Sequence, residues 1–145
     1  MILNIAIVIF MVMELANVLV MYCKPDFKYG NSMTVFNEWH KSKADSNSSL
    51  FARYMVNWVA NCKLIFIAIL AVVLFVGDER IKLYSVGATV LSIGLYFITL
   101  HPIIRKLDAA GEITPKGYSR TLGFMIAGFM VMFAVAFVLH LALGL

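Results

Sequence analysis

Charged residues are scarce in this chain. They make up 14% of its 145 residues, whereas hydrophobic residues make up 62%. Because a soluble domain usually carries roughly 25% charged residues, the composition excludes an ordinary water-soluble domain. Cysteine is scarce too, and Cys23 and Cys62 form no C-x-x-C or comparable metal-binding spacing. The sequence therefore predicts neither a disulfide framework nor a zinc, iron or haem site.

Familiar catalytic patterns are also missing. The chain has no P-loop, dinucleotide-binding or Ser-His-Asp signature. Its net charge of +4 comes from basic residues that flank apolar runs, which is typical of membrane topology signals and not of a nucleic-acid-binding surface. We therefore favour a non-enzymatic protein and expect no bound metal, cofactor or nucleic acid.

Long apolar runs fill most of the sequence. A membrane-spanning helix needs about 20 mostly apolar residues. Four segments meet this requirement, at residues 2–21, 51–76, 81–104 and 118–143. The first run lacks the basic start and the cleavage site of a secretory signal, so we interpret it as a retained span. The predicted fold class is a single all-α domain, residues 1–145, with four transmembrane helices in an antiparallel bundle.

Basic residues are distributed unevenly between the segments that join these runs. The first and third loops with their flanks hold nine lysines and arginines, and the second loop holds two, Arg80 and Lys82. In membrane proteins the cytoplasmic loops carry the excess of basic residues. We therefore predict that both termini face outward and that the first and third loops are cytoplasmic. The nine residues are Lys24, Lys28, Lys41, Lys43, Arg53, Arg105, Lys106, Lys116 and Arg120.

The first loop, residues 22–50, is too long for a simple connector. Met33, Phe36 and Trp39 recur there every three residues. This spacing predicts a short interfacial helix, with Trp39 at the level of the lipid headgroups. An alternative is a lid or substrate loop that uses Glu38 and His40.

Two ionisable side chains, Glu14 and Lys63, lie deep inside apolar runs. A charge in hydrocarbon costs roughly 3 kcal/mol, so it is normally paired, hydrated or functional. Asn17 shares the helix face of Glu14. Because the first two spans run antiparallel, Glu14 and Lys63 can meet, although the long stem of Lys63 could instead reach the headgroups. These three residues are the first candidate site, either for an ion or ligand or for a structural ion pair.

A second candidate site is a basic and amide-rich rim at the cytoplasmic ends of the spans. Arginine there could bind an anion through paired hydrogen bonds, or could simply anchor helices at the interface. The residues are Arg53, Asn57, Asn61, His101, Arg105, Tyr118 and Arg120.

Part of this rim is similar to the membrane-associated glutathione and eicosanoid enzymes, which have four spans and about this length. Arg53-x-x-x-Asn57 matches their Arg-x-x-x-Asn-x-x-Glu stripe on the second span, with Ala60 at the glutamate position. Arg120 matches the arginine that opens their fourth span. The resemblance implies a membrane-embedded transferase that binds glutathione, an anionic thiol cofactor.

Two functional interpretations follow. Four helices of this length enclose little space, so a substrate path would need a homo-oligomer or a partner. The first interpretation is a non-enzymatic transporter or channel protomer, or an accessory subunit of a larger membrane complex, with Glu14 as proton or cation site, Asn17 as co-ligand and Lys63 as counter-charge. The alternative is the glutathione-binding transferase.

Overall fold

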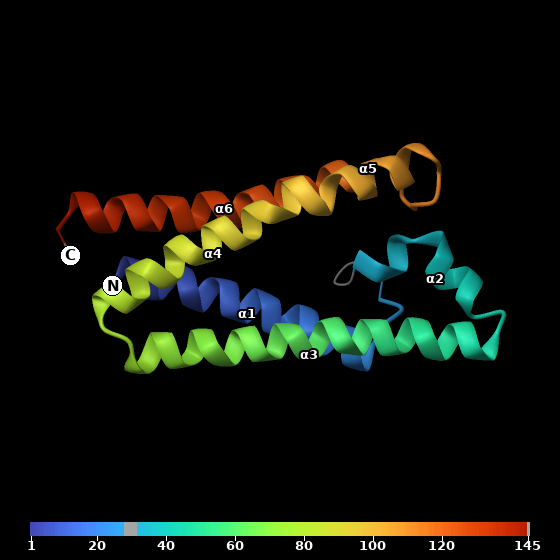
Figure 1. Ribbon diagram of the computed structural model, residues 1–145, viewed down its shortest axis with the longest axis horizontal. Coiled ribbons are helices and arrows are strands. Elements are labelled where there is room, and N and C mark those ends of the chain that lie inside the picture. The colour runs from blue at the N-terminus through green and yellow to red at the C-terminus, as the bar shows by residue number, and fades with distance from the viewer. Residues whose placement is uncertain (28–31, 145) are drawn as a thin grey trace.

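The computed structural model describes residues 1–27 and 32–144, so Lys28 lies outside the described residues. Within this part of the chain, the structure is helical and contains four helical segments long and apolar enough to cross a membrane. They pack as a bundle (Figure 1), which confirms the predicted fold class of an integral multi-pass membrane protein. The segments are α1 (Ile2–Cys23), α3 (Ser46–Val76), α4 (Glu79–Thr99) continued by α5 (His101–Ala109), and α6 (Tyr118–Ala142).

The two termini lie at the same end of the bundle, and α2 lies at the other end together with the turn between α5 and α6 (Figure 1). This arrangement places the first and third loops together, as four antiparallel spans require. Which end faces the cytoplasm stays a prediction from the distribution of lysine and arginine.

Helix α3 begins earlier than the sequence suggested. We expected the second span to start near residue 51, but the helix begins at Ser46 because Asp45 caps it by accepting a hydrogen bond from the Ser48 amide at 2.8 Å. At its other end the Gly77 amide donates to Val73 O at 3.0 Å. A Cβ on Gly77 would lie 2.5 Å from that carbonyl oxygen, so the turn requires glycine. Asp78 then caps α4.

The third span is longer than expected and is interrupted once. Instead of ending near residue 104, the chain continues as α5 to Ala109. The interruption falls at Leu100, just before Pro102 in the first turn of α5. Proline lacks an N–H and its ring crowds the preceding turn, so the α-helical hydrogen-bond ladder cannot run through it unbroken.

The core near the termini is apolar and aromatic. The Phe10 ring makes edge-to-face contacts with Phe66, Phe129 and Phe133, with ring centroids 5.1–5.9 Å apart. These rings come from α1, α3 and α6, so a single side chain joins three helices. Since lipid is as apolar as the core, such helices associate through close packing and not through the hydrophobic effect.

The first loop contains the predicted short helix and is folded onto the bundle. A 3₁₀ turn (η1, Ser32–Val35) leads into α2 (Asn37–Ser42). Trp39, which we expected at headgroup level, is buried with Val18, Met21 and Val56 from α1 and α3. Its indole N–H donates to the Asp26 carboxylate at 2.8 Å, and this partner keeps the buried ring nitrogen satisfied.

Candidate functional site

An ion pair joins α1 to α3. The ammonium of Lys63 donates to Oε2 of Glu14 at 2.7 Å, as the antiparallel geometry of the two spans allowed. The Glu14 side chain is 17% exposed and the Lys63 side chain is 30% exposed. We call Glu14, Asn17, Asn61 and Lys63 the seam, because all four lie along this pair of helices.

The pair lies near the middle of α1, the first candidate membrane span. Glu14 is nine residues from the end of α1 at Cys23 and twelve from its start at Ile2. At 1.5 Å per residue these separations are ~14 Å and ~18 Å, about half the hydrocarbon thickness each. Lys63 therefore uses its flexible stem to reach a carboxylate inside the bilayer. The bond to Glu14 replaces the predicted alternative in which it turns to the headgroups.

The two amides of the seam have different surroundings. Asn17 is half-buried, one helical turn from Glu14, and makes no side-chain hydrogen bond within the described part of the chain. Asn61 is exposed, and its Oδ1 accepts a hydrogen bond from the hydroxyl of Tyr22 on α1. The seam thus holds α1 and α3 together at two levels, by the ion pair and by the Tyr22–Asn61 bond.

The structure divides the predicted basic rim. Arg53 and Asn57 are exposed on α3, whereas Arg105 and Arg120 line a groove between α5 and α6. Figure 1 shows α3 along the opposite edge of the molecule from α5 and α6, with α2 between them at this end. Tyr118 is half-buried and packs against the apolar cluster of Val35, Ile104 and Ile113. Arg53, Asn57 and Arg120 are therefore not brought together.

The groove between α5 and α6 extends to Phe97 on α4, has a volume of about 740 Å³ and changes character along its length. Arg105, Lys116 and Arg120 line it close to the loop between α5 and α6. Aromatic and small residues line it further into the span. Between these two parts lies the ring of His101, which approaches Gly123 so closely that a Cβ there would be 3.1 Å from Cε1 of the ring. The apolar part is lined by Phe97, Gly123, Phe124 and Ala127.

Asp108 shapes the charged end of this groove, and sequence reasoning missed its role. The third span was expected to end at residue 104, before Asp108, but this residue is buried on α5. Its carboxylate accepts from the Gly117 amide at 2.8 Å, the Ser119 amide at 3.0 Å and the Ser119 hydroxyl at 2.6 Å. Gly117 adopts φ +87°, which glycine tolerates readily. The spacing of Asp108 from the start of α6 was the only available signal, and it does not show which groups converge.

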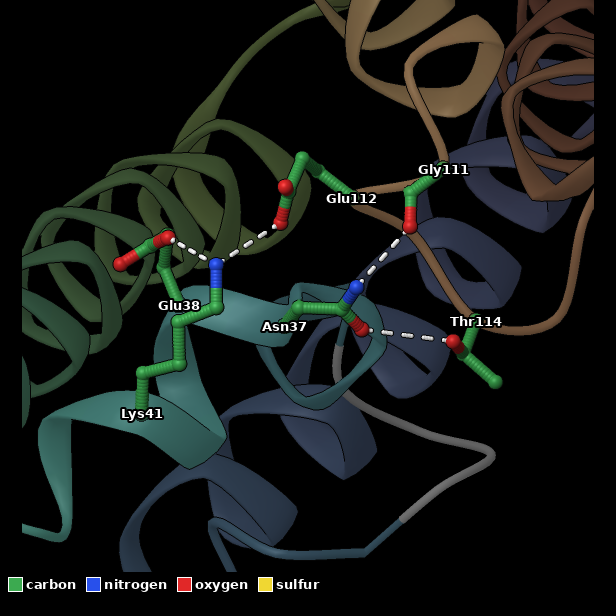
Figure 2. A network of polar contacts seen from close by, with 6 residues as sticks. All are labelled: Asn37, Glu38, Lys41, Gly111, Glu112 and Thr114. Carbon is green, nitrogen blue, oxygen red and sulfur yellow. Dashed lines mark hydrogen bonds and ion pairs between the residues drawn. The ribbon is translucent and has the colours of Figure 1, made fainter.

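A polar network holds the first and third loops together, and Figure 2 shows its side chains. The amide of Asn37 donates through Nδ2 to Gly111 O at 2.9 Å and accepts through Oδ1 from the Thr114 hydroxyl at 3.3 Å. Lys41 donates to Glu38 at 2.7 Å and to Glu112 at 3.1 Å. The backbone also pairs, since the Thr114 amide donates to Val35 O at 2.8 Å. We call this network of loop contacts the clasp.

The residues that we considered as a possible lid make contacts within or beside the clasp. Glu38 pairs with Lys41, and Nε2 of His40 lies 3.0 Å from Thr34 O. Neither residue lines the groove between α5 and α6. Among the described residues, no group of three or more His, Cys, Asp or Glu side chains could hold a metal ion. Cys23 and Cys62 are free and exposed thiols.

Comparison of the chain with protein-family models, with curated proteins and with solved structures found no significant match. Its function has therefore to be inferred from its own residues and their geometry.

Proposed function

We propose that this protein is a non-enzymatic protomer of a homo-oligomeric membrane assembly, and that the seam is the face covered by a second copy. One observation carries the proposal. A carboxylate and an ammonium near the middle of the membrane are 17% and 30% exposed at the surface of a single four-helix unit. Lipid offers no hydrogen bonds to these groups, so covering them with protein stabilises the seam.

The unused hydrogen-bonding groups of the seam support a partner inside the membrane. The Lys63 ammonium has three N–H donors, and among the described residues it donates only to Glu14. Exposed Asn61 accepts from Tyr22 through its oxygen, which leaves its amide NH₂ to donate elsewhere. Side chains of this kind hydrogen-bond across helices in membrane bundles.

The chemistry of the seam favours a second copy over a charged partner. The ion pair is neutral as a whole, so it does not call for a partner of either sign. An asparagine amide both donates and accepts, so the same face on two copies can be self-complementary across a two-fold axis. The neutrality of the pair also disfavours a free ion at Glu14, because the ammonium of Lys63 already occupies that position.

Cysteine cross-linking in native membranes tests this proposal. Cys62 is exposed and adjoins both Asn61 and Lys63. In a Cys23→Ser background, we expect a short bismaleimide to join two copies through Cys62. The matched control is Ser92→Cys in a chain without native cysteines, because Ser92 is exposed on the apolar helix α4, away from the seam.

Sedimentation in detergent gives the second readout. We expect an oligomer for the wild type and a shift toward monomer for the triple variant Glu14→Gln, Asn61→Leu, Lys63→Met. A wild type that is monomeric at every protein-to-detergent ratio, with no Cys62 cross-link in membranes, would contradict the proposal. Ligand uptake that depends on pH and is lost in Glu14→Gln would instead indicate the transporter, with Asn17 as co-ligand.

A further inference from the structure

We propose that the groove between α5 and α6 is a binding site for an anionic amphiphile, with a phosphate-type headgroup at its basic end and an acyl chain along its apolar part. This site is independent of the oligomer proposed above, because the groove lies on α4, α5, α6 and the loop before α6 and shares no residue with the seam.

The charge of the groove is the first support. Arg105, Lys116 and Arg120 line it, and among the described residues none of them forms an ion pair with a carboxylate. The one acidic residue in the lining is Asp108, and both of its oxygens already accept hydrogen bonds from Gly117 or Ser119. The basic end therefore carries a surplus of positive charge, and its guanidinium groups are available to bind an oxyanion.

The order of residues along the groove is the second support. Phe97 lies eight residues before Arg105, and Ala127 lies seven residues after Arg120. At 1.5 Å per residue, the apolar part thus extends ~10–12 Å further into the span than the arginines. A soluble anion would use only the basic end, whereas an anionic lipid matches both parts. Phe124 is 71% exposed beside the groove, so an acyl chain can enter from the bilayer.

The way the groove is built gives the third support. Asp108 fixes the start of α6 against the end of α5 through three hydrogen bonds, which holds Arg120 and Arg105 on facing walls. The close approach of His101 to Gly123 sets the separation of the two helices one turn deeper. Basic pockets between transmembrane helices are known to bind anionic lipid headgroups.

The experiment measures binding of defined lipids to the full-length protein in detergent by native mass spectrometry. The variant is the double substitution Arg105→Ala with Arg120→Ala. The control is Arg53→Ala, which removes an exposed arginine from α3 at the same end of the molecule. The probes are phosphatidylglycerol, zwitterionic phosphatidylcholine and inorganic phosphate. Since Arg105 and Arg120 are exposed and form no ion pair among the described residues, we expect the double variant to fold.

We expect saturable binding of phosphatidylglycerol to the wild type, much weaker binding of phosphatidylcholine, and unchanged binding in Arg53→Ala. The double variant should bind phosphatidylglycerol about 30-fold more weakly, since each arginine near an anionic lipid contributes about fivefold. Equal losses in Arg53→Ala and the double variant would overturn the site, because they would show general surface attraction.

Two further measurements separate a lipid from a soluble anion. Ala127→Phe fills the apolar part and leaves both arginines in place, so it should weaken binding of phosphatidylglycerol but not of inorganic phosphate. Millimolar phosphate should not displace the lipid. If phosphate displaces it and Ala127→Phe has no effect, the acyl part of the proposal is wrong and the groove binds soluble oxyanions.

Discussion

The seam and the clasp contain lysine–glutamate bonds of the same length in different surroundings. Lys63 lies 2.7 Å from Glu14 and Lys41 lies 2.7 Å from Glu38. The first pair is 30% and 17% exposed near the middle of the membrane, whereas the second is 57% and 74% exposed on a loop. Ion pairs of equal length therefore need not contribute equally to stability.

The difference follows from what surrounds each charge when its partner is lost. Water solvates a lone lysine or glutamate on a loop, so an exposed pair contributes little beyond the entropy of ordering two long side chains. Hydrocarbon cannot solvate a lone charge, so a pair inside the membrane is stabilised mostly by the high energy of its separated members. Single substitutions should therefore have large effects at the seam and small effects at the clasp.

The largest effect is expected for the seam. Glu14→Gln or Lys63→Met alone should lower the free energy of unfolding by about 3 kcal/mol, because each leaves one unpaired charge in hydrocarbon. The double variant should recover most of this loss, since it removes both charges together. SDS titration of the protein in mixed micelles measures all three variants.

Lys24→Met provides the control for the seam, because Lys24 is an exposed lysine just beyond α1. It should unfold like the wild type. If Glu14→Gln is neutral or stabilising, the comparison fails. The carboxylate would then be retained at a cost to the fold, as at a functional site, and ligand and proton-coupling assays should start there.

An intermediate effect is expected for the amide of the clasp. Asn37→Ala removes the hydrogen bonds to Gly111 and Thr114 and should lower the free energy of unfolding by about 1 kcal/mol. Hydrogen exchange of the Thr114 amide, which donates to Val35, should speed up in the same variant. Unchanged exchange would show that the backbone pairing holds the two loops together without the side chains.

The smallest effect is expected for Lys41→Met. At pH 7 its unfolding midpoint should match that of the wild type at both low and high salt. Hydrogen bonds to Glu38 and then to Glu112 raise the pKa of the Lys41 ammonium above its ordinary value. Any stability from this group is therefore fully present below its ordinary pKa and is lost as the pH rises through the higher pKa of the folded state.

The two proteins should accordingly unfold alike at alkaline pH above the raised pKa of Lys41, where this side chain carries no charge in the folded or the unfolded state. The same melting experiment across pH 7 to 11 checks this prediction. A loss in Lys41→Met at pH 7 as large as that of Lys63→Met would contradict the comparison, since it would make the exposed pair equal to the one in the membrane.

Local sequence patterns were sufficient to predict the four spans and the short helix of the first loop. Apolar run length predicted α1, α3, α4 and α6, because a helix is the simplest way to satisfy backbone hydrogen bonds in lipid. The start of α3 was misjudged, because its first turn is polar and depends on the Asp45 cap, which precedes the apolar run. Helix length beyond the membrane is set by such caps and not by hydropathy.

The candidate sites were predictable in part. Antiparallel spans and equal depth were enough to suggest that Glu14 and Lys63 meet, because helical rise converts sequence separation into depth. Equal depth along the helices also led us to group Arg53 and Arg120 in one rim. Depth, however, does not determine where a residue lies around the bundle. The structure has Arg53 on α3 and Arg120 in the groove with Arg105.

Four membrane spans and an ionisable pair in the first two of them could be predicted from the sequence, since run length, hydropathy and helical rise are local properties. Only the packing of the helices shows that Asp108 fixes the start of α6, that Trp39 of α2 is buried against α1 and α3, and that the basic residues divide between α3 and the groove. Those outcomes depend on which helix faces meet. Which helix faces meet is set by packing and by hydrogen bonds between residues far apart in the chain, so no local pattern predicts it.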